Sequence, residues 1–160
     1  MKKFILIAAM IMMSVAAFAQ SGRSIYQKYS DAEKVSAVYI SPAMFKLIGN
    51  IPDLEISDEN VDLTPVIKSL KGLYLINSAN PDIKDGIIKD VDAFVCSADY
   101  ELLMEAKEEG ETVRIYTVGN EQTVKGFVML ACEPEELTFI CINGEMERDQ
   151  LDAIFAKMMR

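Results

Sequence analysis

The sequence contains no histidine and no tryptophan. The missing histidines exclude Ser–His and Cys–His nucleophilic pairs and the zinc sites that rely on imidazole ligands. They also remove the side chain best suited to proton transfer near neutral pH. An enzyme built from this chain would have to use carboxylates, lysine, tyrosine or cysteine. Because no phosphate-binding glycine loop or cluster of metal ligands is evident either, we expect no metal site and no cofactor.

Cysteine is also scarce, with three residues at Cys96, Cys132 and Cys141. An odd number leaves at least one thiol unpaired within a monomer, and whether any two form a disulfide stays open. All three have apolar neighbours, a pattern that predicts small buried core residues rather than reactive thiols.

Long apolar runs are missing from most of the chain, and the exception is Phe4–Phe18. This run follows two lysines and ends in Ala-Phe-Ala, the small-residue pattern that a signal peptidase reads. It is shorter than the roughly 20 residues of a membrane-spanning helix. We predict a signal peptide over residues 1–19, cleaved between Ala19 and Gln20, and no transmembrane segment after its removal. The alternative is a single membrane anchor.

Residues 20–160 have a length that suits one domain. No cysteine directly follows the apolar run, so the usual lipoprotein route is not indicated, and we expect a periplasmic or secreted protein. Without the two leader lysines, 14 basic residues face 25 acidic ones, which is a net charge of −11. Nucleic-acid affinity rests on lysine and arginine neutralising phosphates. We therefore expect no nucleic-acid partner.

Three helix starts combine a capping side chain with proline at the first helical position. They are Ser41-Pro42, Thr64-Pro65 and Asn80-Pro81. The apolar residues that follow the first start are Met44, Phe45, Leu47 and Ile48, which helical spacing places on one face for burial. The runs 35–40 and 73–76 predict strands, and Ser24 predicts the cap of a short helix near the start of the domain. The acidic segment 51–62 lacks the ligand spacing of a calcium loop.

From Tyr100 the apolar period changes from about 3.6 residues to 2. Four strands are predicted, over about 100–107, 112–117, 123–132 and 137–143, and their short connections make them an antiparallel meander. The last two are nearly all apolar, which predicts central, well-covered positions. Asn143-Gly144 predicts a turn into a final helix. Together the elements predict an α+β fold: a two-layer, mainly antiparallel sheet with helices chiefly on one face.

A binding surface is expected on the sheet face that the helices leave uncovered. In the second strand of the meander, Arg114 and Tyr116 alternate with apolar residues, and Thr112 lies beside them. Alternation makes Arg114 and Tyr116 the candidate binding residues. The alternative is an ordinary solvated sheet face.

Four short runs, taken in order, resemble a known family. They are Ile25-Tyr26-Gln27-Lys28-Tyr29-Ser30, Val38-Tyr39-Ile40-Ser41-Pro42-Ala43-Met44-Phe45, Leu70-Lys71-Gly72-Leu73-Tyr74 and Tyr100-Glu101-Leu102-Leu103-Met104. The chain resembles the small exported bacterial proteins of domain of unknown function 4252. The resemblance implies export and a single domain over nearly the whole chain after residue 19. It implies no activity, cofactor or catalytic residue.

These observations predict a non-catalytic binding or interaction module of the cell envelope, whose partner is an envelope protein or a small ligand. The alternative is a carboxylate-based hydrolase acting on an envelope or glycan substrate. That chemistry requires two carboxylates about 5 to 10 Å apart across a cleft. The ligand, the oligomeric state and the choice between periplasm and exterior stay open.

Overall fold

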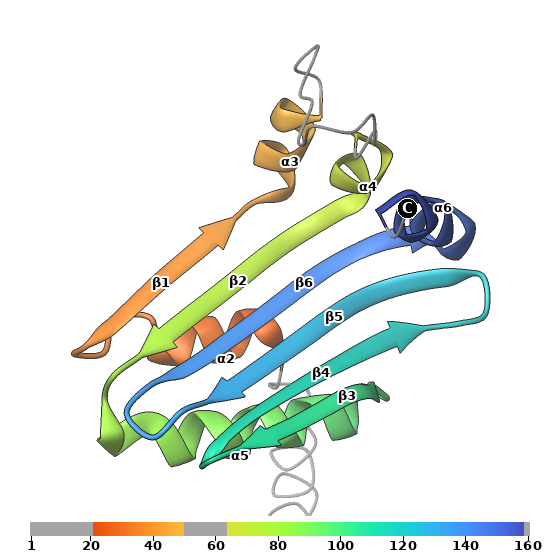
Figure 1. Ribbon diagram of the computed structural model, residues 1–160. Helices are drawn as coiled ribbons and strands as arrows, with labels where there is room; N and C mark the ends of the chain where they lie inside the picture. Colours follow the sequence, from red (N-terminus) through yellow and green to blue (C-terminus); the bar gives the residue numbers. More distant parts are fainter. Residues whose placement is uncertain (1–20, 50–63, 159–160) are drawn as a thin grey trace, which may run out of the picture.

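A computed structural model of the 160-residue chain describes residues 21–49 and 64–158. These residues form a six-stranded antiparallel sheet and five helices (Figure 1). In chain order the elements are α2 (Gly22–Tyr29), β1 (Val35–Ile40), α3 (Pro42–Ile48), α4 (Thr64–Ser69), β2 (Leu70–Ser78), α5 (Pro81–Ser97), β3 (Glu101–Glu108), β4 (Glu111–Gly119), β5 (Thr123–Cys132), β6 (Leu137–Glu147) and α6 (Arg148–Met158). The predicted α+β class is confirmed. The predicted signal peptide, its cleavage site and the segment 51–62 lie outside the described residues.

The strands lie in the order β1-β2-β6-β5-β4-β3. Strands β3 to β6 pair with their sequence neighbours, so the predicted four-stranded meander is confirmed. The last strand of the chain, β6, lies between β2 and β5 in the middle of the sheet.

Helices α2 and α5 pack against one face of the sheet, behind it in Figure 1. The side chains between these layers form the core, and its fully buried members are Ile25, Ile76, Ile87, Val91, Val128, Leu130, Leu137, Phe139 and Cys141. Burying apolar surface at about 25 cal/mol per Å² makes this layer the main source of stability. Helices α3, α4 and α6 lie at the end of the sheet where β2 begins and β6 ends (Figure 1).

Capping hydrogen bonds form at the predicted helix starts Ser41-Pro42 and Asn80-Pro81. The Ser41 hydroxyl accepts a hydrogen bond from the Met44 amide at 3.3 Å, and the Asn80 side chain accepts one from the Asp82 amide at 3.0 Å. Each bond satisfies an amide that lacks an intrahelical acceptor. Helix α2 begins earlier than predicted, because Ser21 is its cap and Ser24 completes a reciprocal capping box.

The short helix α3 buries less of its apolar surface than its spacing predicted. Phe45 is buried, whereas Met44 and Leu47 are 49% and 66% exposed. The prediction that all these side chains would be buried is wrong for Met44 and Leu47. Helix α3 has only seven residues and contacts α4 and β2. These contacts cover the side of the helix that carries Phe45.

Two strand predictions are also corrected. Leu102 lies opposite Tyr116 and Met104 opposite Ile115, so one extra residue, Leu103, forms a bulge in β3. Leu102 and Met104 therefore point to opposite faces, although simple alternation placed them on one. Strand β6 does not turn at Asn143-Gly144; it continues to residue 147 because its end pairs with the start of β5.

A charged cluster joins α2 to α5. The Lys28 ammonium and the Tyr29 hydroxyl both donate to the same oxygen of Asp90, at 2.6 and 2.7 Å. Burial alone raises the pKa of the Asp90 carboxyl, but the hydrogen bonds from Lys28 and Tyr29 outweigh it, and the pKa lies below its ordinary value. The ionised carboxylate is therefore the form that the folded state prefers.

This cluster predicts an acid-dependent contribution to stability. Because the pKa of Asp90 is lower in the folded state, its contribution is present above the ordinary value of 3.8 and is lost as the pH falls through the lowered folded pKa. We expect Asp90→Asn to lower the free energy of unfolding by about 1 kcal/mol near neutral pH, discounted for partial exposure. Urea unfolding of both proteins should show this difference shrinking below pH 3.8.

Asp92→Asn is the matched control, since Asp92 is half exposed and lies 3.4 Å from Arg114. It should change stability little at either pH. A difference between wild type and Asp90→Asn that stayed constant with pH would contradict the assignment.

Candidate functional site

The predicted binding residues Arg114 and Tyr116 lie on the face that α5 covers. Arg114 is opposite Leu130 and Tyr116 is opposite Val128, and both of these partners are buried beneath the helices. The prediction that Arg114 and Tyr116 lie on the uncovered face is therefore wrong. Both side chains are only partly buried, because they lie at the margin of the helix layer, where their polar ends reach water.

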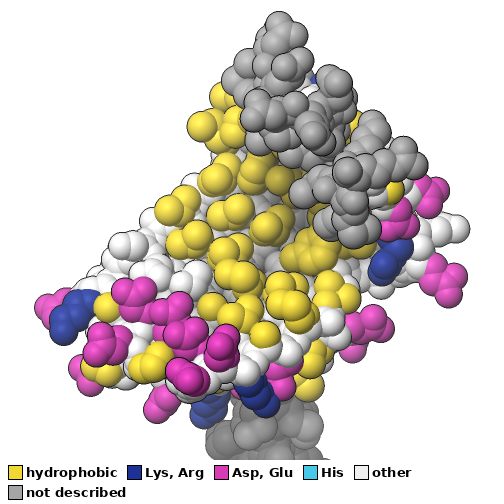
Figure 2. All heavy atoms as spheres, viewed as in Figure 1, with side chains coloured by type: hydrophobic (Ala, Val, Ile, Leu, Met, Phe, Trp, Pro, Cys, Tyr) yellow, Lys and Arg dark blue, Asp and Glu magenta, His cyan; other side chains and the backbone are white. Residues whose placement is uncertain are grey.

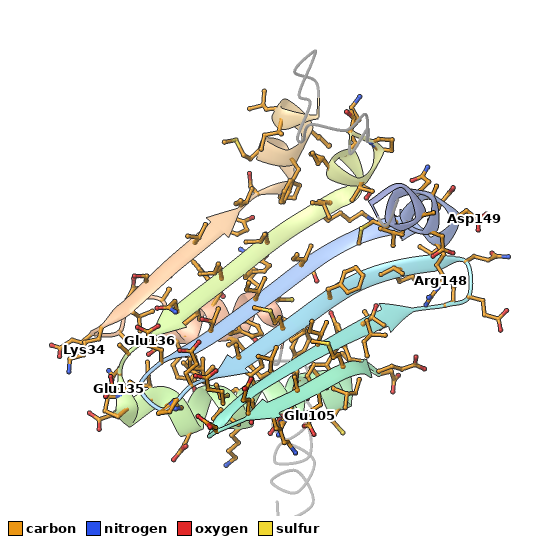
Figure 3. The ribbon with its side chains drawn as sticks, in the orientation of Figure 1. Lys34, Glu105, Glu135, Glu136, Arg148 and Asp149 are labelled. Carbon is orange, nitrogen blue, oxygen red and sulfur yellow. The ribbon has the colours of Figure 1, made fainter. Side chains whose placement is uncertain are left out.

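Arg114 is already engaged by two carboxylates. Its Nε donates to Glu105 of β3 at 2.9 Å, and its Nη1 donates to Asp92 of α5 at 3.4 Å (Glu105 is labelled in Figure 3). Burial alone lowers the pKa of Arg114, but the interactions with Glu105, Tyr116 and Asp92 together outweigh it, and the pKa lies above its ordinary value. Arg114 therefore links β3, β4 and α5, and its charge is neutralised within the fold.

A cavity of about 180 Å³ adjoins this ion network. Its lining consists of Ile88, Thr112, Arg114, Leu130 and Cys132. Typical small-molecule sites have volumes of about 300 to 1,000 Å³. This cavity is too small for most ligands of that class, so Thr112 and its neighbours do not define a binding pocket.

The three cysteines occupy different environments, and all are free. Cys141 is buried, and burial raises the pKa of its thiol to about 12. Cys132 is partly buried, and burial raises the pKa of its thiol as well. Cys96 is exposed, so the predicted burial is wrong for this residue. It lies in the last turn of α5, on the side away from the sheet-facing residues Phe94 and Val95.

A second cavity, of about 470 Å³, lies among loops near the start of α6. It is lined by Glu101, Gly119, Asn120, Glu121 and Arg148. All but Arg148 are exposed, whereas a hydrolase encloses its reacting groups away from bulk water. Arg148 donates to the Asn120 carbonyl at 2.7 Å, so its guanidinium helps to hold the loop. This arrangement does not favour the carboxylate-based hydrolase.

The most distinctive surface is the sheet face opposite α2 and α5, called here the open face. One row of directly opposed residues crosses all six strands on it. In strand order the row is Val38, Leu75, Ile140, Met129, Ile115 and Met104. Every member is apolar, and the two at the edges, Val38 and Met104, are each 46% exposed. The four central members are partly covered by one another.

The two rows beside this central row differ in polarity. On the side toward α6 the row is Ile40, Leu73, Ile142, Phe127, Thr117 and Glu101. On the other side it is Ser36, Asn77, Thr138, Ala131, Val113 and Ala106. The open face is thus apolar over its centre, and Glu101 at the edge is the single ionisable residue in the three rows. Figure 2 shows this apolar area over the middle of the sheet.

The charged residues gather at the rim. At one end of the sheet, the β3–β4 and β5–β6 turns carry six exposed glutamates: Glu108, Glu109, Glu111, Glu133, Glu135 and Glu136. Figure 3 shows Glu135 and Glu136 at this end and Arg148 at the opposite end of the sheet. Lys34 also lies at this end (Figure 3), and the Lys84 ammonium donates to the Glu133 and Pro134 carbonyls, but the glutamates outnumber the lysines, so we call this the acidic end. The open face therefore combines an uncharged centre with a strongly charged margin at one end.

An antiparallel sheet with one solvated face normally shows apolar side chains on one face and polar ones on the other. Here both faces of the central strands are apolar, and large exposed apolar patches mark interaction surfaces. The sequence signal for this surface is the nearly continuous apolar character of β5 and β6. This signal correctly predicted that β5 and β6 are central strands. Among the described residues, however, a helix layer covers only the face of the sheet opposite the central row.

Fold and surface together define a two-layer α+β protein with an apolar sheet face available for contacts. Residues 29–154 match the family described as a domain of unknown function, DUF4252, and the chain belongs to this family. No curated protein and no solved structure matches the chain. Within residues 21–49 and 64–158, no cluster of three or more candidate ligands could hold a metal ion. No helix in these ranges is long and apolar enough to cross a membrane.

Proposed function

We propose that this protein is a non-catalytic interaction module of the cell envelope that binds a protein through its open face. The central row of the open face carries this proposal, because six apolar residues, one from each strand, form a continuous stripe. Covering such a stripe releases water from apolar surface and favours association. Protein interfaces have an apolar centre and a polar rim, and the open face has both.

The shape and size of the open face favour a protein over a small ligand. Small-molecule sites are concave and enclose most of the ligand. The open face is the surface of a sheet, and the 180 Å³ cavity lies on the other side, next to α5. A broad apolar surface is matched best by another broad apolar surface.

The predicted signal peptide and the resemblance to exported proteins support the envelope as the location. The absence of histidine supports a non-catalytic role, since the commonest acid–base and nucleophilic arrangements are excluded. Binding through the open face requires neither a cofactor nor a reactive residue.

Site-specific photo-crosslinking in living cells tests this proposal. A photo-reactive amino acid replaces Met104 in one protein and Leu102 in another. These residues are 46% and 52% exposed on the same edge strand, but they point to opposite faces. We expect a discrete cross-linked product from position 104 and a much weaker one from position 102. Mass spectrometry identifies the partner, and N-terminal sequencing of the same product should begin at Gln20.

Equal products from the two positions would show that contact depends on exposure alone. The proposed function would be contradicted if neither position 104 nor a second open-face position, Val38, gave a cross-linked product. A product containing two copies of this chain and one containing a different protein would both support it.

A further inference from the structure

We infer that the occupant of the open face is a second copy of this chain, packed sheet against sheet with the two acidic ends pointing in opposite directions. This inference rests on the proposed function, because it names the partner of the same surface. Three properties of the open face favour a second copy: its area, the absence of charge at its centre and the placement of charge at its rim.

The area suits a stable dimer. Strands β2, β4, β5 and β6 are nine to eleven residues long. Six strands about 4.8 Å apart, rising about 3.3 Å per residue, give one face a footprint of about 800 to 900 Å². Each partner in a standard protein–protein interface buries about 800 Å². Two open faces placed together would therefore form an interface of ordinary size.

The central row permits self-association of a strongly acidic chain, whose net charge is −9 with the two leader lysines and −11 without them. None of its six residues is ionisable, so no like charges would be buried at the centre of the dimer. Burying an unpaired charge is the main electrostatic obstacle to such an interface. Two twisted sheets of the same hand pack about 10 Å apart with their strands within about 30° of alignment.

The acidic end selects between two symmetric arrangements. A twofold axis parallel to the strands would bring the acidic ends of both copies together, with six glutamates from each. A twofold axis along the central row instead places them at opposite ends of the dimer. The second arrangement separates the like charges by far more than a Debye length of about 8 Å.

A twofold axis along the central row determines which residues of the two copies face each other. A rotation about the central row brings each of its residues opposite the same residue of the other copy. Met129, near the middle of the row, faces Met129 of the second copy, and Ile140 faces Ile140. Met129→Glu would thus bury two carboxylates close together. Each would lack a cationic partner at the centre of the interface.

Sedimentation velocity over a range of concentrations tests the inference on the full-length chain expressed with its leader and purified after processing. We expect a dimer for wild type, and a dimer dissociation constant raised about 100-fold or more by Met129→Glu. Leu102→Glu, which adds the same charge on the opposite face, should leave the dissociation constant within a few-fold of wild type. Circular dichroism confirms that the variants are folded. Met104→Glu, at the edge of the row, provides a second variant should Met129→Glu fail to fold.

A spin label at Glu135 distinguishes the two arrangements. With the axis along the central row, the labels on the two copies should lie about 30 Å apart or more, given the rise per residue of the strands. A separation below about 20 Å would indicate the parallel arrangement and would overturn the proposed orientation. Cys96→Ser in the labelled protein removes the exposed native thiol.

A monomeric wild type overturns the second copy as occupant. If photo-crosslinking at position 104 then captures a different protein, the proposed function stands and only this inference fails. A wild-type dimer unaffected by Met129→Glu and Met104→Glu would show association through another surface, which also overturns the inference. Failure of both the crosslinks and the dimer would remove the proposed function as well.

Discussion

Phe139→Ala should lower the free energy of unfolding by about 3 to 5 kcal/mol. Phe139 lies in the central strand β6 with 0% of its surface exposed. It is opposite Ile76 on one side and Leu130 on the other, and both of these side chains are buried beneath the helices. Removing the ring loses its transfer free energy and leaves a cavity that rigid strands on both sides cannot close. Urea unfolding followed by circular dichroism measures the change.

Ile140→Ala is the matched control, because Ile140 is the next residue of β6 and points to the open face. At low protein concentration it should cost only about 1 kcal/mol, since part of the side chain is already exposed. If two copies associate through the open face, this cost should grow with protein concentration, because the dimer buries the side chain. Equal costs at all concentrations for Phe139→Ala and Ile140→Ala would contradict the assignment of the two faces.

Gly119→Ala should destabilise the protein by about 2 to 4 kcal/mol. Gly119 ends β4 with φ +156°, and a Cβ there would lie 2.1 Å from the Thr123 carbonyl oxygen. That oxygen belongs to the backbone and accepts the Asn120 amide at 2.8 Å, so it cannot move without breaking the turn. The register shift between Val118 and Gly119 places this tight contact at the β4–β5 connection.

Gly72→Ala provides the control for this prediction. A Cβ at Gly72 would be 3.6 Å from the nearest Tyr74 atom, which is an ordinary contact. Its effect should stay within about 1 kcal/mol, because alanine also reduces the conformational freedom of the unfolded chain. Thermal unfolding of the two variants compares them directly. Similar midpoints would show that the Gly119 turn can relax.

The sequence predicted the order and type of the elements because local signals mark their ends. Ser41-Pro42 and Asn80-Pro81 begin helices where an oxygen acceptor and proline coincide. The four strands of the meander follow from short polar turns between apolar segments. Such signals depend on a few neighbouring residues, so they do not depend on how the elements pack in the tertiary structure.

The candidate site was harder to predict because it depends on which face of each strand the helices cover. In β4 the alternation separates Arg114 and Tyr116 from Val113 and Ile115, and the usual rule turns the apolar set inward. Here the apolar set, Val113 and Ile115, faces away from α5 and lies on the open face together with its apolar partners on the neighbouring strand. The bulge at Leu103 changes which side chains of β3 point to each face of the sheet. No glycine or proline within the strand signals this bulge in the sequence.

The central position of β6 also has a consequence for how the chain folds. Asn77 of β2 donates to Thr138 of β6, although 61 residues separate them in sequence. Until β6 joins the sheet, β2 and β5 each present an unpaired edge, and the hydrophobic layer remains in two halves. Such non-local pairing makes folding slow, because the loop must close before contacts compensate for the lost entropy. Among the described strands, the last to be synthesised is therefore the one that closes the sheet, so the two halves of the hydrophobic layer cannot join before β6 is complete.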